Sequence, residues 1–291
     1  MTIGKALKWG EKKLNQLKIK SAVIDAEIIL SYTTNHSREQ LFSHPENKIS
    51  AVQWRKYQKL ILRRTKFEPV AYLIGQKEFY GLNFKVNHAV LIPRPETEIL
   101  VESVLKNLKK SKSPQILADI GTGSGNIAIS LMKFAPQQIN KIIVSDICQQ
   151  ALPVARQNAK KLLAKNHQKI KFLQSNLLAS FPKNLKFDII CANLPYLDFK
   201  KIPAKSINSK TLKHEPRKAL AGGRNGLETY QKFFPQIPNH LKKSAQVFLE
   251  IDPKQKKPIK KLTQQYLPAY SVNFIKDLTR KIRIVSIFVN T

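Results

Sequence analysis

Residues 115–135 read QILADIGTGSGNIAISLMKFA, and this stretch carries the strongest structural signal in the chain. It begins as a short apolar run typical of a buried strand and ends in an apolar pattern typical of a helix. Between them, Gly121, Gly123 and Gly125 permit tight backbone geometry, and free amides at the helix start can face a ligand. Asp119 to Asn126 therefore predict a ligand-binding turn, although the same glycine spacing in a dehydrogenase would face a pyrophosphate.

Strand and helix patterns continue to alternate from Pro95 to the C-terminus, with a step of roughly 25 residues. Further strands are expected at KIIVSDI (141–147), KIKFLQS (169–175), KFDIICANLP (186–195), AQVFLEI (245–251) and in a final pair that ends with KIRIVSIFV (281–289). Helices are expected over 151–164 and 228–241. Near-continuous apolar strands separated by helices indicate an α/β fold with a doubly wound, mostly parallel sheet of seven strands.

The chain before the glycine turn has a different texture. Over residues 1–75, apolar residues recur at intervals of three and four, which predicts a small domain of four or five short helices. Over residues 76–95, aromatic and β-branched residues alternate around Gly81 and Asn83, which predicts a β-hairpin linker. The sequence thus divides into a helical domain (1–75), a hairpin linker (76–95) and an α/β domain (96–291).

Polar residues follow three consecutive strands at the expected carboxyl edge of the sheet. Asp146 ends the second strand, 21 residues after Gly125, where an acidic residue accepts hydrogen bonds from ribose hydroxyls. Asn176 follows the third strand and suits an adenine amino group. Together with the glycine turn they predict a nucleoside site; the alternative is a plain turn with Asp146 as a helix cap.

The fourth strand ends in Asn193-Leu194-Pro195-Tyr196. The Asn193 amide can accept from an NH2 group and donate back, and Leu194 is held extended by the following proline, so that its carbonyl can point outward. Tyr196 offers a face to a planar group. This strand end predicts a cradle for a planar group with an NH2, either an amide or an exocyclic base amine; the alternative is a strand end with a proline turn.

The chain is strongly basic, with 51 Lys and Arg against 19 Asp and Glu and a net charge of +32. Such a field attracts nucleic acid or ribosomes without sequence readout, although lysine favoured on every solvated surface gives the same composition. The two cysteines are not part of a Cys/His cluster, so no metal is expected. We expect a cytoplasmic protein, since no signal peptide and no run of 18 apolar residues is present.

At this point the motifs support a resemblance. DIGTGSG, Asp146 and the Asn-x-Pro-Tyr element resemble class I S-adenosylmethionine-dependent methyltransferases that alkylate planar nitrogen. Within that group, the chain resembles the release factor glutamine methyltransferases, and the resemblance covers essentially its whole length. The motifs that carry it are EFYGLNFKV (78–86), LIPRPETE (91–98), ANLPY (192–196) and HEPRKALAGGRNGL (214–227).

The resemblance implies an enzyme with a Rossmann-like methyltransferase sheet that methylates the glutamine amide nitrogen in the Gly-Gly-Gln motif of class 1 peptide chain release factors. It implies that Asn193 and the Leu194 carbonyl hold the glutamine NH2, with Pro195 and Tyr196 lining the slot, and that the helical domain grips the release factor. It implies S-adenosylmethionine as the cofactor, bound by Gly121, Thr122, Gly123, Ser124, Gly125, Asp146, Asn176, Leu177 and Asn193.

One departure keeps alternatives open. The family usually has proline where this chain has Leu194, and Asn-Leu-Pro-Tyr is the form seen in ribosomal RNA adenine dimethyltransferases. In those enzymes, however, the glycine motif comes early and the extra domain follows the catalytic one. A ribosomal-protein glutamine methyltransferase shares the architecture but diverges at the Pro-Glu-Thr-Glu of residues 95–98, and a fold that binds a nucleoside without catalysis is a further alternative.

Overall fold

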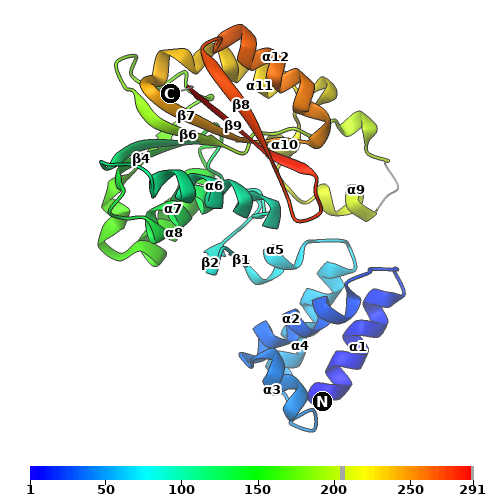
Figure 1. The fold of residues 1–291 in the computed structure, drawn as a ribbon. Coiled ribbons are helices and arrows are strands. Elements are labelled where there is room, and N and C mark those ends of the chain that lie inside the picture. Colours follow the sequence, from blue (N-terminus) through cyan, green and yellow to red (C-terminus); the bar gives the residue numbers. More distant parts are fainter. Residues whose placement is uncertain (204–206, 290–291) are drawn as a thin grey trace. The chain divides into compact units, whose positions relative to one another are not determined.

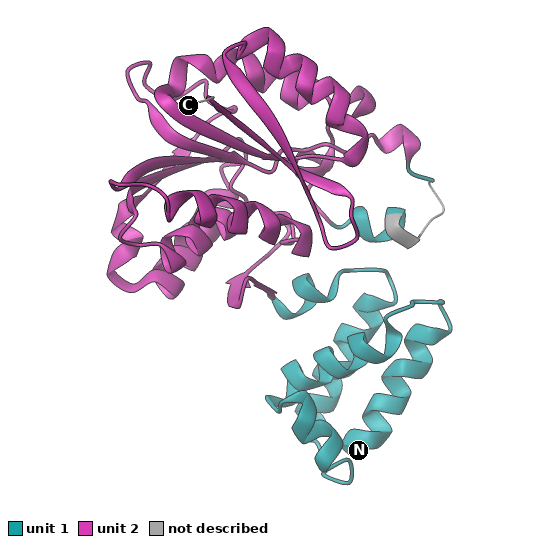
Figure 2. Cartoon of the chain, in the orientation of Figure 1, with its two compact units in different colours: residues 1–76, 202–214 teal, residues 77–201, 215–291 magenta. Residues whose placement is uncertain are grey.

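The computed structural model describes residues 1–203 and 207–289. The chain forms two compact units, one of Met1–Gln76 with Ile202–His214 and one of Lys77–Lys201 with Glu215–Thr291 (Figure 2). Residues 204–206 and 290–291, which fall in the domain expected over 96–291, lie outside the described residues. None of the described helices has the length and apolarity needed to cross a membrane.

The first unit is helical, as the apolar spacing predicted for residues 1–75; the helix α9 from residues 202–214, which were expected in the 96–291 domain, also belongs to it. Its helices are α1 (Ile3–Asn15), α2 (Ala22–Thr34), α3 (Arg38–Ser43), α4 (Ala51–Arg64), α5 (Val70–Ile74) and α9 (Ile207–Leu212). Ser37 and Ser50 begin α3 and α4 with reciprocal capping boxes, which satisfy backbone N–H groups that the helices leave unpaired. The apolar faces meet around the buried Tyr57, and a buried ion pair joins Arg64 to Asp25 at 2.7 Å.

The expected hairpin is formed by β1 (Gln76–Phe79) and β2 (Leu82–Lys85), and the second unit begins within it, at Lys77. Tyr80 and Gly81, between the strands, both have positive φ, the conformation of a tight two-residue turn. Phe79 and Phe84 are buried in the core of the α/β unit. The hairpin is thus part of the same core as the sheet.

The predicted seven-stranded, mostly parallel sheet is confirmed (Figure 1). Its strands, in spatial order, are β5 (Ile170–Gln174), β4 (Ile139–Asp146), β3 (Gln115–Ile120), β6 (Phe187–Ala192), β7 (Leu241–Glu250), β9 (Ile282–Val289) and β8 (Tyr270–Lys276). The first five are parallel, whereas β9 pairs antiparallel with both β7 and β8. The strand order reverses at the β3–β6 pair, where open α/β sheets bind ligands.

Helices bury both faces of the sheet (Figure 1). One face packs on α6 (Glu98–Leu108), α7 (Asn126–Phe134) and α8 (Ala151–Leu163), and the other on α11 (Glu228–Phe233) and α12 (Lys256–Tyr266). The single helix expected over 228–241 is wrong in its length, because α11 ends at Phe233 and two 3₁₀ turns follow. Pro235 and Pro238 lack the N–H groups that a continuing helix would need.

Candidate active site

Four strand ends meet at the carboxyl edge of the sheet because of the strand register. Ile120, the last residue of β3, lies opposite Ser145 in β4 and Ala192 in β6. The glycine turn, Asp146 and Asn193 therefore leave the sheet side by side. The end of β5 joins them, since Gln174 pairs with Asp146.

The glycine turn is anchored to β4 through its backbone. Gly121 and Thr122 both donate N–H bonds to the Ser145 carbonyl, at 2.8 and 2.9 Å. Gly123 has a φ of +53°, and a Cβ added there would meet nothing within 4 Å, so its backbone is open to a ligand. A Cβ added at Gly125 would lie 2.7 Å from Ile129 Cδ1. Glycine at this position therefore lets the Ile129 side chain of α7 pack directly against the backbone at the start of the helix.

The side chains of the turn face inward. Thr122 and Ser124 are buried, and the Thr122 hydroxyl donates to Asp119 Oδ2 at 2.7 Å. Burial raises the pKa of Asp119 to about 6, and its Oδ1 atom has no partner among the described residues. The turn therefore presents backbone amides, rather than Thr122 or Ser124 side chains, to its open side.

Asp146 and Asn176 stand beside this open side. The Asp146 carboxylate accepts N–H bonds from Gly123 at 2.9 Å and from Cys148 at 2.8 Å, and burial raises its pKa. Asn176 is exposed after β5, whereas Leu177 is buried with a φ of +58°. The structure thus brings the predicted nucleoside-binding positions to one edge; their roles stay predictions.

Asn193 is held by a side chain from the LIPRPETE segment. Its Nδ2 donates to Thr97 Oγ1 at 3.0 Å, and the Thr97 hydroxyl donates to Glu250 Oε2 at 2.6 Å. No described residue donates to Asn193 Oδ1, and the side chain is partly exposed. The amide therefore turns its NH2 inward and has its oxygen available to an incoming donor.

Tyr196 binds the other carboxylate oxygen of Glu250. Its hydroxyl donates to Glu250 Oε1 at 3.1 Å, and burial raises its pKa. Leu194 is 2% exposed and packs its side chain toward Gly121, while Pro195 is partly exposed between them. The four predicted acceptor-site residues therefore lie together, directly beside the glycine turn.

The 214–228 segment supports this strand end through backbone contacts. Leu197 pairs with Ala221 in a short parallel bridge. The Leu197 N–H donates to the Leu220 carbonyl, and the Gly222 N–H donates to the Leu197 carbonyl, both at 2.9 Å. A Cβ at Gly226 would come within 2.0 Å of the Tyr196 carbonyl oxygen. Glu215 ties the segment to the linker by accepting from Arg94 and from the Ile92 N–H. The backbone around Gly222 and Gly226 therefore packs directly against Pro195 and Tyr196.

Thr97 and Glu250 are the residues that sequence reasoning missed. Thr97 lies within a segment that signals the resemblance, and Glu250 lies at the end of an apolar strand, where an acidic residue is a visible anomaly. Neither pattern reveals that the two side chains meet, because they are 153 residues apart. The signal that was available is the position of Glu250 at a strand end in the same row as Asp146 and Asn193.

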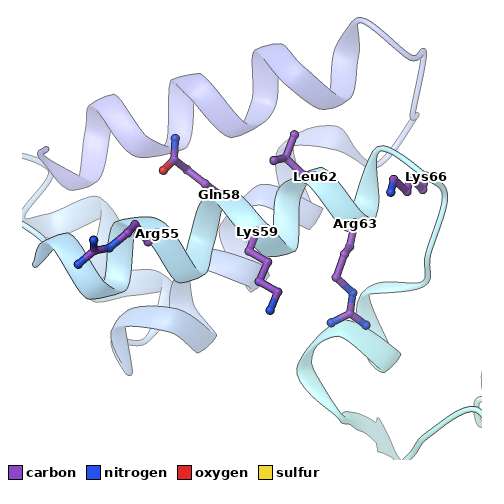
Figure 3. Close-up of a pocket in the computed structure, with 6 residues that line it drawn as sticks. All are labelled: Arg55, Gln58, Lys59, Leu62, Arg63 and Lys66. Atoms are coloured by element: carbon purple, nitrogen blue, oxygen red, sulfur yellow. The ribbon is translucent and has the colours of Figure 1, made fainter.

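A separate hollow lies on the helical unit along α4. It is lined by Arg55, Gln58, Lys59, Leu62, Arg63 and Lys66, and Figure 3 shows Lys59 and Arg63 projecting from the same side of the helix. Its lining combines four basic side chains with Gln58 and Leu62. Its charge would attract an anion, but the affinity for RNA or ribosomes expected from net charge stays a prediction.

Comparisons with known proteins find two matching families along the chain. Residues 5–75 match the PrmC N-terminal domain family, and residues 95–224 match the methyltransferase small domain family. A release factor glutamine methyltransferase of Bacillus cereus is 35% identical over 98% of both chains, and one of Koribacter versatilis is 36% identical over 86% of both. A solved methyltransferase from Pyrococcus furiosus shares the fold with a TM-score of 0.50 at 20% identity, covering 79% of this chain and 96% of that one.

Proposed function

The chain belongs to the family of release factor glutamine methyltransferases, and we propose that it methylates the glutamine of the Gly-Gly-Gln motif in class 1 peptide chain release factors. The methyl group goes to the side-chain amide nitrogen. The observation that carries this proposal is the Asn193 amide, whose NH2 is held by Thr97 and whose oxygen faces outward beside the glycine turn. That arrangement suits an acceptor with an NH2 group.

S-adenosylmethionine fits the neighbouring strand ends. The open backbone at Gly123 permits close approach, the Asp146 carboxylate can accept from ribose hydroxyls, and the exposed Asn176 amide suits the adenine edge. When bound, this cofactor supplies a sulfonium-activated methyl group. The turn itself is formed by Gly121, Thr122, Ser124 and Gly125. Leu177 is linked to the neighbouring strand, because its carbonyl accepts from the Ser145 hydroxyl at 3.4 Å.

The acceptor presents a chemical difficulty, because the lone pair of an amide nitrogen is delocalised into its carbonyl. In the proposed mechanism, Asn193 Oδ1 and the Leu194 carbonyl accept the two N–H bonds of the glutamine and aim its nitrogen at the methyl group. Both bonds strengthen as the nitrogen becomes positive, so they favour the transition state over the ground state. Pro195 and Tyr196 line the slot, and fixed positioning supplies most of the remaining acceleration.

No separate general base is needed. Methylation makes the nitrogen cationic, and the proton that it then loses is strongly acidic and passes to water. Tyr196 is poorly suited to accept this proton, since burial and the nearby Glu250 carboxyl raise its pKa and keep its hydroxyl protonated. The chain's residues therefore act by orientation and electrostatics instead of by proton transfer.

A direct assay distinguishes this substrate from its alternatives. Labelled S-adenosylmethionine is incubated with the enzyme and, in parallel, a purified class 1 release factor, ribosomal proteins and small-subunit RNA, and the methyl group is mapped by mass spectrometry. We expect label only on the glutamine of the Gly-Gly-Gln motif. Label on RNA adenine or on a ribosomal protein would replace the proposal, and no label anywhere would favour a binding protein.

The helical unit is proposed to recognise the release factor. It contributes none of the strand-end residues, and its defining features are structural: capped helices around Tyr57 and the buried Arg64–Asp25 ion pair. A folded unit with no chemistry of its own suits a role in gripping a protein substrate. We retain the same division of labour for residues 1–75, 76–95 and 96–291, with catalysis assigned to the last.

Asp146 provides the first prediction. Asp146→Asn keeps the size of the side chain but leaves one acceptor oxygen to serve Gly123, Cys148 and a ribose hydroxyl. Loss of a hydrogen bond to a charged group, about 1.5–3 kcal/mol, should weaken cofactor binding by about 10-fold to 10²-fold. Calorimetric titration measures this change, with Asp277→Asn in the β8–β9 turn as the control. An unchanged dissociation constant would remove Asp146 from the cofactor site.

Leu194 provides the second prediction. No hydrogen bond of the described residues uses its N–H, so Leu194→Pro should leave the acceptor carbonyl in place and turnover near that of the unchanged chain. The lost packing of about one carbon, roughly 0.8 kcal/mol, is offset by the reduced freedom of the unfolded chain. Steady-state assays and thermal unfolding measure both effects. An inactive but folded variant would mean that this strand end is shaped for a different acceptor.

A further inference from the structure

The buried carboxyl of Glu250 stands behind the acceptor site and has no part in the transfer as described above. Glu250 ends β7 and is 1% exposed. Its side chain receives the Thr97 hydroxyl at 2.6 Å and the Tyr196 hydroxyl at 3.1 Å. A third hydroxyl, that of Tyr230, donates to its backbone carbonyl. This concentration of donors on one buried acid needs an explanation beyond packing, because a buried polar group is costly unless it is satisfied.

The number of hydrogens on each group decides which group donates and which accepts in the Asn193–Thr97–Glu250 chain of hydrogen bonds. A threonine hydroxyl carries one hydrogen, and Thr97 uses it on Glu250. Thr97 Oγ1 can then only accept from Asn193, at 3.0 Å. The two ends of an asparagine amide are nearly equal in size, so its orientation is set by its partners. A partner that can only accept selects the NH2 end, and the oxygen must face outward.

We propose that Glu250, acting through Thr97 and only as a carboxylate, is a positioning residue that keeps the Asn193 oxygen turned toward the acceptor amide. This inference rests on the proposed function, since it assigns that oxygen to the substrate NH2. Glu250 touches neither the acceptor nor the cofactor in this scheme. Its effect is to fix which end of Asn193 the substrate meets.

Protonation of Glu250 reverses the direction of the network. The carboxylic acid O–H can donate to Thr97 Oγ1, and the threonine hydrogen is then released to point at Asn193. The Asn193 amide satisfies that donor by turning its oxygen inward, which leaves its NH2 facing the substrate NH2. Two donors then oppose each other, and the acceptor is no longer held. The proton stays on Glu250 throughout, so nothing is consumed.

The surroundings of Glu250 set the pH at which its carboxyl is protonated. Burial is the main cause that raises the pKa of Glu250 to about 7, with a further increase from Glu96 on the 3₁₀ helix η1 (Pro95–Thr97). Arg283 on β9 and the bonds from Thr97 and Tyr196 act in the opposite direction. Since the carboxylate is the productive form, turnover should rise with pH through about 7 and fall as the acid is protonated.

The first test compares turnover in Glu250→Gln, Thr97→Val and Thr97→Ser over a range of pH. Glu250→Gln and Thr97→Val should lower kcat by about 10-fold to 10²-fold, on the scale of a misplaced reacting group, with KM for S-adenosylmethionine unchanged. Both should lose the acidic limb of the pH profile, because the switch is gone. Thr97→Ser keeps the hydroxyl and should retain both rate and limb. A purely structural role for Glu250 would not move the limb.

The second test reads the amide itself and needs no substrate. The side-chain ¹⁵N–H₂ resonances of Asn193, assigned by their loss in Asn193→Asp, should shift with pH through the titration of Glu250. Glu250→Gln should abolish this shift, and Glu96→Gln should move it to lower pH, because one carboxylate that opposes ionisation is removed.

The two tests separate this inference from the proposed function. If the unchanged enzyme does not methylate a release factor, the proposed function is overturned, and the resonances still decide the present inference. If the resonances do not follow Glu250, or if Thr97→Val and Glu250→Gln keep the rate and the acidic limb of the unchanged enzyme, the inference is overturned.

Discussion

Asn193→Ala is expected to lower turnover on the release factor by about 10²-fold or more, the scale of losing one preorganised polar group at a reacting centre. The substitution removes the oxygen that faces the acceptor and also the NH2 that binds Thr97. Binding of S-adenosylmethionine should be nearly intact, because the glycine turn and Asp146 are held by Ser145 and by each other. The expected result is therefore a large loss in kcat with little change in cofactor affinity.

Two measurements on the same preparation check this result. Single-turnover methylation gives the rate at saturating substrate, and calorimetry gives the cofactor dissociation constant. Asn87→Ala, an exposed asparagine that caps the Ala89 N–H in the same unit, is the matched control and should behave as the unchanged chain. If cofactor affinity collapsed in Asn193→Ala, the residue would belong mainly to the cofactor site.

Gly226→Ala should reduce turnover by a similar or larger factor through the backbone. The added Cβ would come within 2.0 Å of the Tyr196 carbonyl oxygen, and the φ of +70° is already unfavourable for alanine. Relief requires Pro195 and Tyr196 to shift, and displacement by about 1 Å costs on the order of 10²-fold in rate. Overpacking of about 1–3 kcal/mol and a left-handed alanine of about 1–2 kcal/mol should also lower the free energy of unfolding.

Gly81→Ala separates the two causes. Gly81 has the same φ of +70°, but a Cβ there meets nothing within 4 Å. It should therefore show only the conformational cost, about 1–2 kcal/mol by chemical denaturation, and retain turnover. Rates are compared at a temperature where circular dichroism shows both variants folded. Equal turnover in the two variants would mean that the 214–228 segment does not shape the acceptor slot.

Much of the fold follows from local patterns in the chain. The apolar runs at 115–120, 141–146 and 187–192 are strands because both faces of the sheet are covered, and such strands need no polar alternation. Once these strands are parallel, their polar terminal residues must meet at one edge, so Asp146 and Asn193 could be predicted to lie beside the glycine turn. The helical first unit was equally readable from its spacing.

The supporting contacts could not be predicted in the same way. The Thr97–Glu250 bond and the fit of Gly226 against Tyr196 join segments far apart in sequence, and both depend on side-chain or loop geometry that periodicity does not encode. The inward orientation of the Thr122 side chain depends likewise on the buried Asp119, whose carboxylate accepts a hydrogen bond from its hydroxyl. The break after Phe233 differs, because Pro235 and Pro238 were a visible signal for it.

We propose that the strand end Asn193-Leu194-Pro195-Tyr196 holds a glutamine amide. The most direct test is a crystal structure of the enzyme with S-adenosylhomocysteine and a release factor carrying its Gly-Gly-Gln motif. We expect the glutamine nitrogen within about 3 Å of both Asn193 Oδ1 and the Leu194 carbonyl oxygen, with Asn193 Nδ2 still bound to Thr97. A glutamine seated elsewhere, or one that meets Asn193 Nδ2 in place of Oδ1, would contradict it.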